Sequence, residues 1–286
     1  MRRRELFPAL AAAPFAAAQL ASAQPAKIQR KGRLKQCVTA GVFARGMSFE
    51  DMCKEAARQG CIGFDLRGPQ DWPTLKKYGL IPTMYPPGPG GTISDALNRK
   101  ENHERLEKAM HAAIDESAAN GVPNIITFSG NRRGMSDSEG ADNCVLFLNK
   151  VKAHAEDKGI NICMELLNSK VNHKDYMCDH TAWGADVCKR VGSPRVKLLY
   201  DIYHLQIMEG DICRTIKDNF QWIGHYHTGG NPGRHELDET QELNYRFVAK
   251  TIADLGFTGY VAHEYSPAQG RDAIQSLNQA MEIFDV

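Results

Sequence analysis

The sequence lacks a surplus of charge of either sign. Its 286 residues include 35 Lys and Arg against 34 Asp and Glu, so the formal net charge is only +1. It also lacks any long block of like charge. Proteins that bind nucleic acid or another polyanion usually carry a basic patch or stripe. We therefore expect no nucleic-acid partner.

The close cysteine spacings of a structural zinc site are also missing. No C-x-x-C pair and no closely paired Cys/His set occurs among the eight cysteines. Most cysteines fall inside apolar periodic segments, where a free thiol behaves as a small buried hydrophobe. We therefore expect mainly buried thiols, while one or two disulfides remain open. The cysteines in apolar segments are Cys37, Cys53, Cys61, Cys163, Cys188 and Cys213.

A third absence is that of a glycine-rich phosphate loop. Residues 41–46, which follow the first predicted strand, do not supply the G-x-G-x-x-G pattern of dinucleotide-binding open sheets. The composition does not shift after residue 36 either, so residues 36–286 are predicted to form a single domain. That length suits a (β/α)8 barrel, which takes roughly 250 residues.

Short β-branched runs alternate with longer helical patterns from residue 36 onward. Strands are predicted at 37–43, 61–66, 81–85, 124–129, 160–165, 196–201, 223–228 and 260–264. Helices are predicted at 48–59, 101–120, 141–158, 181–191, 211–219, 244–255 and 272–284. Eight strands, each followed by a connection back to the next, predict a closed (β/α)8 TIM barrel, with a doubly wound open sheet as the alternative.

Glycines and prolines punctuate this pattern. Several helical segments end on a glycine, as a quick reversal into the next parallel strand requires: Gly60, Gly121, Gly159, Gly192 and Gly256. Residues 86–91 hold three prolines and three glycines, so we expect a loop after the third strand. That loop is either a lid over the barrel mouth or a surface excursion without a role.

Residues 1–23 have the layout of a bacterial export signal. Three arginines, Arg2 to Arg4, precede an alanine-rich apolar stretch at 7–21, and a small-residue cleavage site ends at Ala23. Residues 3–7 resemble a twin-arginine signal. The apolar run is shorter than the roughly 20 residues of a membrane-spanning helix. We therefore expect a cleaved signal, a linker at 24–35, and a periplasmic protein with no membrane attachment after cleavage.

Polar residues fall at the carboxyl ends of the last four predicted strands. Glu165 ends the fifth strand, Asp201 ends the sixth, His225 and His227 lie on the seventh, and Glu264 ends the eighth. In a barrel these ends surround one mouth, so the side chains should converge. A single strand-end carboxylate could simply cap the next helix, but four in register make that explanation much weaker.

Three carboxylates and an imidazole form a hard, oxygen-rich set. Such a set suits Mn²⁺ or Mg²⁺, with Co²⁺ as a further candidate, better than a metal that prefers thiolates. Carboxylates buried side by side without a cation would repel each other, which itself indicates a bound charge. We therefore predict a divalent metal site.

Several segments of the C-terminal half resemble the hydroxypyruvate isomerase family of the xylose isomerase-like TIM barrels, whose relatives include the ketose 3-epimerases. The segments that carry the resemblance are Y-D-I-Y-H at 200–204, I-G-H at 223–225, N-P-G-R at 231–234, E-L-N-Y at 242–245 and H-E-Y-S-P at 263–267. In the N-terminal half the resemblance is limited to the order of strands and helices.

The resemblance implies roles for particular residues. Glu165, Asp201, His227 and Glu264 would bind the metal, and Glu165 and Glu264 would also be the catalytic acid/base pair. His204 and Arg234 would bind substrate oxygens. From the residues alone, His204 could instead orient Asp201, and Arg234 could be a solvated loop residue.

The implied reaction interconverts hydroxypyruvate and 2-hydroxy-3-oxopropanoate through an enediolate, an aldose–ketose type isomerisation. The seventh strand departs from the family, because His225-Tyr226-His227 stands where hydroxypyruvate isomerases usually have H-x-Q. A ketose 3-epimerase or an inositol-type sugar isomerase is therefore an alternative. A non-catalytic exported carbohydrate-binding barrel is an alternative of another class. The partner is a small hydroxy-carbonyl or sugar molecule in each case, and homo-oligomerisation stays open.

Overall fold

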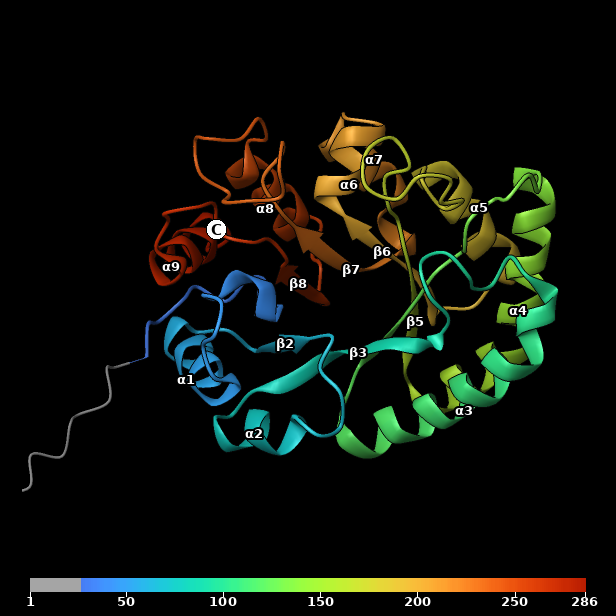
Figure 1. Cartoon of the computed structure of the whole chain (residues 1–286), viewed down its shortest axis with the longest axis horizontal. Helices are drawn as coiled ribbons and strands as arrows, with labels where there is room; N and C mark the ends of the chain where they lie inside the picture. Colours follow the sequence, from blue (N-terminus) through green and yellow to red (C-terminus); the bar gives the residue numbers. More distant parts are fainter. Residues whose placement is uncertain (1–26) are drawn as a thin grey trace, which may run out of the picture.

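The computed structural model of the protein describes residues 27–286. Eight parallel strands form a closed barrel in chain order, and helices surround it (Figure 1). The strands are β1 (Lys35–Val38), β2 (Gly63–Asp65), β3 (Ile81–Gly90), β4 (Asn124–Thr127), β5 (Asn161–Glu165), β6 (Val196–Asp201), β7 (Ile223–Thr228) and β8 (Tyr260–His263). Strand β1 closes the barrel against β8, with Val38 opposite His263. The predicted (β/α)8 barrel is confirmed, and the open sheet is excluded.

Nine α-helices lie in the described part of the chain. They are α1 (Phe49–Gln59), α2 (Trp72–Lys77), α3 (His103–Asn120), α4 (Asp137–Lys158), α5 (Thr181–Val191), α6 (Ile202–Met208), α7 (Ile212–Asn219), α8 (Tyr245–Asp254) and α9 (Ala273–Ile283). Short 3₁₀ turns span Ala40–Val42, Lys100–Asn102 and Phe220–Trp222. None of the helices within residues 27–286 has the length and apolar character needed to cross a bilayer.

Glycine ends four of these helices as predicted. Gly60, Gly121, Gly159 and Gly192 are all C-caps in the left-handed conformation, which glycine adopts without steric cost. At Gly256 the prediction misses by one residue, because Leu255 is the cap of α8.

Two predicted segments differ in the structure. The first strand ends at Val38 and not at residue 43, because the chain turns into the 3₁₀ segment Ala40–Val42 at the barrel mouth. The predicted loop at 86–91 is wrong, since β3 continues to Gly90 and pairs with β4 beyond a bulge. Gly90 permits this pairing, because a Cβ there would lie 2.6 Å from the Thr127 Cα. This segment is thus attached to the barrel wall.

The apolar core lies between the barrel and the helices. Leu106 and Ile114 of α3 and Phe147 and Val151 of α4 are fully buried there, and each such side chain contributes about 1.5–3 kcal/mol by burial. All eight cysteines lie within the described residues as free thiols, seven of them buried, so the expectation of buried thiols is confirmed. The disulfide alternative is not observed among them.

The export signal predicted at 1–23 lies outside the described residues, and it stays a prediction. Of the predicted linker at 24–35, the structure describes residues from Lys27 onward. Arg30 bonds to Gln59 and Asn278, so this stretch is attached to α1 and α9. Strand β1 begins at Lys35, one residue before the predicted domain boundary.

Candidate metal centre and active site

Four of the predicted residues converge at the carboxyl ends of β5 to β8. Glu165 is the last residue of β5, Asp201 the last of β6, His227 lies near the end of β7, and Glu264 directly follows β8. One ligand atom from each residue lies within 4.8 Å of the other three. The side chains of Asp201 and His227 are fully buried, while 25% of the Glu264 side chain is exposed. Glu264 is therefore the member of the set that faces the barrel mouth.

His227 lies at the centre of this group. Its Nδ1 is 3.2 Å from Glu165 Oε1 and 2.5 Å from Glu264 Oε2, whereas Asp201 Oδ2 is 3.9 Å away. Neither short contact has hydrogen-bonding alignment, so this buried Nδ1 has no hydrogen-bond partner in the described structure. Burial alone would lower the pKa of His227, but the surrounding carboxylates outweigh it and raise that pKa well above its ordinary value.

Asp65 at the end of β2 is a site residue that the sequence did not reveal. It is fully buried, and its Oδ2 lies 3.0 Å from His227 Nε2 and 2.6 Å from His225 Nε2. Thr83 donates to the other oxygen, Oδ1. Burial would raise the pKa of Asp65, but the two histidines lower it below its ordinary value. Asp65 is thus a carboxylate that accepts a hydrogen bond from His227 Nε2. This bond leaves Nδ1 of His227 directed at the other carboxylates.

Glu165 and Glu264 have pKa values displaced in opposite directions. Burial raises the pKa of Glu165, and the nearby charges of Glu264 and Asp201 add to that rise against the opposing effect of His227. Burial would also raise the pKa of Glu264, but His227 and Arg234 outweigh it and lower the value. Two carboxyl groups whose pKa values are pushed apart are suited to separate acid and base roles.

The structure places Arg234 inside the site and not in solvent. Its Nη2 donates to Asp201 Oδ2 at 2.6 Å and to Glu264 Oε2 at 2.7 Å, and its Nε donates to the Glu264 carbonyl at 3.0 Å. The guanidinium also lies over the Tyr203 ring, 5.1 Å from the centroid. This loop arginine therefore contributes a fixed positive charge beside two of the four converging residues.

His204 belongs to the short helix α6, which starts directly after Asp201. The backbone N–H of His204 donates to Asp201 Oδ1 at 3.1 Å, so Asp201 caps the helix that carries His204. The ring Nε2 lies 2.5 Å from Arg234 Nη1 and 3.9 Å from Asp201 Oδ2. Burial lowers the pKa of His204 to about 3, so the ring is neutral at physiological pH. The imidazole therefore does not act on Asp201 directly.

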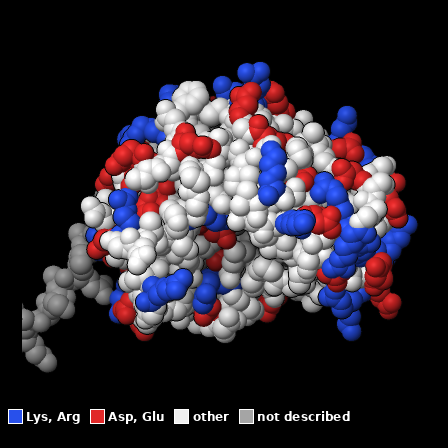
Figure 2. Space-filling view, turned by 45° about the horizontal axis from the view of Figure 1, so that its top comes forward, with Lys and Arg blue, Asp and Glu red and all other residues white. Residues whose placement is uncertain are grey.

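A cavity of about 370 Å³ opens beside these residues, at the ends of β1, β2 and β8. It is large enough for a small hydroxy-carbonyl compound. Its lining consists of Thr39, Ala40, Gly41, Asp65, Leu66, Arg67, Arg234, Glu264, Tyr265 and Ser266. Elsewhere on the surface, the face shown in Figure 2 carries basic and acidic side chains interspersed, with no continuous basic stripe.

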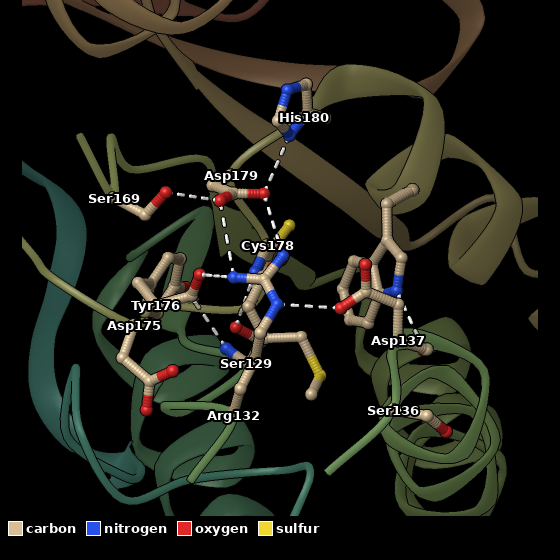
Figure 3. A network of polar contacts seen from close by, with 12 residues as sticks. Ser129, Arg132, Ser136, Asp137, Ser169, Asp175, Tyr176, Cys178, Asp179 and His180 are labelled. Carbon is tan, nitrogen blue, oxygen red and sulfur yellow. Dashed lines mark hydrogen bonds and ion pairs between the residues drawn. The ribbon is translucent and has the colours of Figure 1, made fainter. Parts of the chain in front are cut away.

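A charged network anchors the loop after β5 (Figure 3). Arg132, in the loop after β4, pairs with Asp137 at 2.7 Å and with Asp179 at 3.1 Å. Asp179 also accepts from Ser169 at 2.5 Å and contacts His180 Nδ1 at 2.7 Å. The network thus joins the loops that follow β4 and β5.

Tyr176 connects this anchored loop to the site. Its hydroxyl donates to the Glu165 carbonyl at 2.9 Å and accepts from the backbone N–H of Ser129 at 3.1 Å. Tyr176 is fully buried, so both bonds are shielded from water. The backbone of Glu165 is therefore held by residues that come from both loops.

The residues present fit a divalent cation. Glu165, Asp201 and Glu264 supply oxygen ligands and His227 supplies an unpaired, buried nitrogen, which together suit Mn²⁺ or Mg²⁺. Asp65 completes the arrangement, since metal-binding histidines usually donate their other N–H to a carboxylate. A second group of potential ligands, Cys37, Asp65 and His225, shares Asp65 with this support.

A family model described as xylose isomerase-like TIM barrel matches residues 73–284. The match covers well over half of the chain, and the closed barrel agrees with it. The chain belongs to this family. The fold and membership predicted from the sequence are therefore confirmed.

Within the family, two curated relatives share part of the sequence. A 2-oxo-tetronate isomerase of Cupriavidus necator is 36% identical over 111 residues, which cover 38% of this chain and 42% of the relative. A hydroxypyruvate isomerase of Escherichia coli is 35% identical over 111 residues, covering 38% of this chain and 43% of the relative. The matches thus span less than half of the length of these relatives.

A solved structure resembles the whole barrel. It is described as an AP endonuclease, family 2, from Brucella melitensis, and it superimposes with a TM-score of 0.76 at 24% identity. The match covers 85% of this chain and 96% of that one. At this identity the likeness shows the fold alone.

Proposed function

We propose that this protein is a metal-dependent isomerase that interconverts hydroxypyruvate and 2-hydroxy-3-oxopropanoate. The observation that carries the proposal is the pair Glu165 and Glu264, whose carboxylates both contact His227 Nδ1 and whose pKa values are displaced in opposite directions. The named activities of the curated relatives are consistent with it. Metal ligation by Glu165, Asp201, His227 and Glu264 is part of the proposal.

The reaction moves one carbon-bound hydrogen from C3 of hydroxypyruvate to C2, while the hydroxyl proton passes from O3 to O2. Glu264, ionised because of its low pKa, is suited to remove the C3 proton. Glu165, the second carboxylate of the pair, is suited to deliver a proton at C2. A bound divalent cation would supply charge stabilisation for the enediolate oxygens. Mn²⁺, Mg²⁺ and Co²⁺ are the candidates.

His204 and Arg234 are proposed to bind substrate oxygens. Arg234 pairs with Glu264 and lines the cavity, and the buried ring of His204 contacts Arg234. A guanidinium can pair with a carboxylate through two parallel hydrogen bonds, and hydroxypyruvate has such a carboxylate. The remaining substrate would then extend toward the glutamate pair.

The experiment is a product assay with a panel of substrates. Protein loaded with Mg²⁺ or Mn²⁺ is offered hydroxypyruvate and several ketoses, and the products are identified by proton NMR. Formation of 2-hydroxy-3-oxopropanoate is expected. Turnover of ketoses alone would replace the proposal with a sugar epimerase, and absence of any turnover would leave a carbohydrate-binding barrel.

One observation favours the second candidate, a ketose 3-epimerase or inositol-type isomerase. His227, and not a glutamine, is the side chain of β7 that faces the three carboxylates. An imidazole at this position is the feature that the sequence shares with ketose epimerases. Both candidates use the same glutamate pair, so the substrate panel separates them.

A further inference from the structure

The side-chain amide of Asn168 has a fixed orientation. Asn168 is fully buried in the loop after β5. Its Oδ1 accepts from the backbone N–H groups of Val171 at 3.1 Å and Asn172 at 2.8 Å. Backbone N–H groups can only donate, so the oxygen and nitrogen of this amide cannot be exchanged.

The fixed amide determines which ring nitrogen of His204 carries the proton. Asn168 Nδ2 lies 2.6 Å from His204 Nδ1, and since an amide NH₂ only donates, Nδ1 must accept. The same NH₂ donates its second hydrogen to Asn172 Oδ1 at 2.7 Å. A neutral imidazole with an accepting Nδ1 carries its hydrogen on Nε2.

The Nε2–H of His204 points at another donor. Arg234 Nη1 lies 2.5 Å from it, and the arginine has no acceptor capacity. The Nε and Nη2 groups of Arg234 are already bonded to Glu264 and Asp201, so Nη1 is the group of this guanidinium that lacks an acceptor. The carboxylate oxygen nearest to His204 Nε2, Asp201 Oδ2, is 3.9 Å away. Two donors therefore face each other at 2.5 Å without an acceptor between them, and one of them belongs to Arg234, which lines the cavity.

We propose that Asn168 is a positioning residue that fixes His204 as a hydrogen-bond donor, so that His204 Nε2–H and Arg234 Nη1 both donate to one acceptor oxygen of the substrate, which moves the two nitrogens apart from 2.5 Å. The occupant is a carboxylate oxygen of a 2-oxo acid anion. A neutral ketose lacks the carboxylate charge that would pair with the Arg234 guanidinium. The substrate part of this inference rests on the proposed function, whereas the tautomer does not.

The substitution Asn168→Asp reverses the polarity of this contact. A carboxylate accepts from His204 Nδ1–H, so the ring hydrogen moves to Nδ1 and Nε2 becomes an acceptor for Arg234. His204 and Arg234 then bond to each other and no longer offer two donors to a substrate oxygen. We expect KM for hydroxypyruvate to rise about 10- to 100-fold, the range of such supporting contacts, with a smaller change in kcat.

Asn172→Asp is the matched control. It adds the same charge to the same loop but keeps an accepting oxygen for Asn168 and for the Tyr203 hydroxyl at 3.1 Å. We expect its KM to stay within about twofold of the natural protein, because the His204 tautomer is unchanged.

Nitrogen-15 NMR of the histidine rings in substrate-free protein measures the tautomer itself. The expected result is a protonated Nε2 on His204 in the natural protein and in Asn172→Asp, and a protonated Nδ1 in Asn168→Asp. A protonated Nδ1 in the natural protein, or an unchanged KM in a folded Asn168→Asp variant, would overturn the inference. Absence of turnover in the natural protein would instead refute the proposed function and leave the tautomer measurement standing.

Discussion

Two buried histidines, His227 on β7 and His204 on α6, have neighbours of opposite hydrogen-bonding polarity. His227 contacts the carboxylate of Asp65, which accepts from Nε2 and leaves Nδ1 toward three carboxylates. His204 contacts the amide of Asn168, which donates to Nδ1 and leaves Nε2–H toward Arg234. The same ring is thereby suited to bind a metal in one place and to donate to an oxygen in the other. The residue that bonds to the other ring nitrogen decides which of these two roles the imidazole has.

The largest expected effect comes from removing the base beside His227. Glu264→Gln should lower kcat about 10²- to 10⁴-fold, because the amide cannot take up a proton. The fold should be intact by circular dichroism. His204→Gln, which leaves the glutamate pair in place, should act mainly on KM. Steady-state kinetics of the two variants measure both effects. Near-natural turnover by Glu264→Gln would contradict the assignment of Glu264 as the catalytic base.

Asp201→Ala should abolish stoichiometric metal binding, because it removes one of the four converging side chains and leaves Arg234 nearby. Elemental analysis of purified protein measures this. Full metal occupancy in the variant would show that the proposed ligand set is wrong.

Asp65→Asn should weaken metal binding about 10- to 100-fold, because the amide no longer fixes Nδ1 of His227 as the free nitrogen. Thr83→Val is the matched control, since Thr83 contacts the Asp65 oxygen that lies away from His227. Calorimetric titration with Mn²⁺ measures both. In Asn168→Asp the affinity for Mn²⁺ should be unchanged. If Asn168→Asp weakened Mn²⁺ binding as much as Asp65→Asn, the claim that only His227 binds the metal would be contradicted.

Metal affinity should rise with pH. Ligands bind a cation in their deprotonated forms. Burial raises the pKa of Glu165, and the surrounding carboxylates, outweighing burial, raise that of His227. Below those raised values both groups hold protons that a cation must displace, so affinity is lost as the pH falls. Titrations in buffers of different ionisation enthalpy should detect proton release, and a pH-independent affinity would contradict the ligand assignment.

Disrupting the charged network in Figure 3 should have the smallest effect on the His204 tautomer and on metal binding at His227. Arg132→Ala removes hydrogen bonds to Asp137 and Asp179 and should lower the free energy of unfolding by about 1.5–3 kcal/mol. The His204 tautomer and metal affinity should change little. Arg133→Ala, on the exposed side of the same loop, is the control. Chemical denaturation measures both variants.

The sequence predicted the barrel and the four converging residues because both depend on regular patterns. Strand ends follow alternating runs, and polar residues at those ends of β5 to β8 must meet in a closed barrel. Asp65 also ends its strand, β2, so the same rule could have found it, but the predicted strand ran on to residue 66. Asn168 followed no such pattern. Asp65 meets His227 across 162 positions of the chain, and the orientation of Asn168 depends on backbone bonds within an irregular loop.

The helices that were missed have a similar explanation. Helices α2 and α6 contain six and seven residues, too few for a helical period to repeat twice. The start of α6 was nevertheless encoded locally, because Asp201 caps it. That capping carboxylate is also one of the proposed metal ligands. The two roles that the sequence offered as alternatives for a strand-end carboxylate, helix cap and metal ligand, are therefore compatible in Asp201.

Deuterium incorporation from solvent tests the central claim most directly. Hydroxypyruvate is incubated in D₂O with Mg²⁺-loaded protein and proton NMR follows the signals of the hydrogens at C3 and C2, with chelator-treated protein alongside. Exchange that the chelator abolishes and that Glu264→Gln lacks is the predicted result. Equal exchange with and without chelator, or none with loaded natural protein, would contradict a metal-dependent proton transfer at this site.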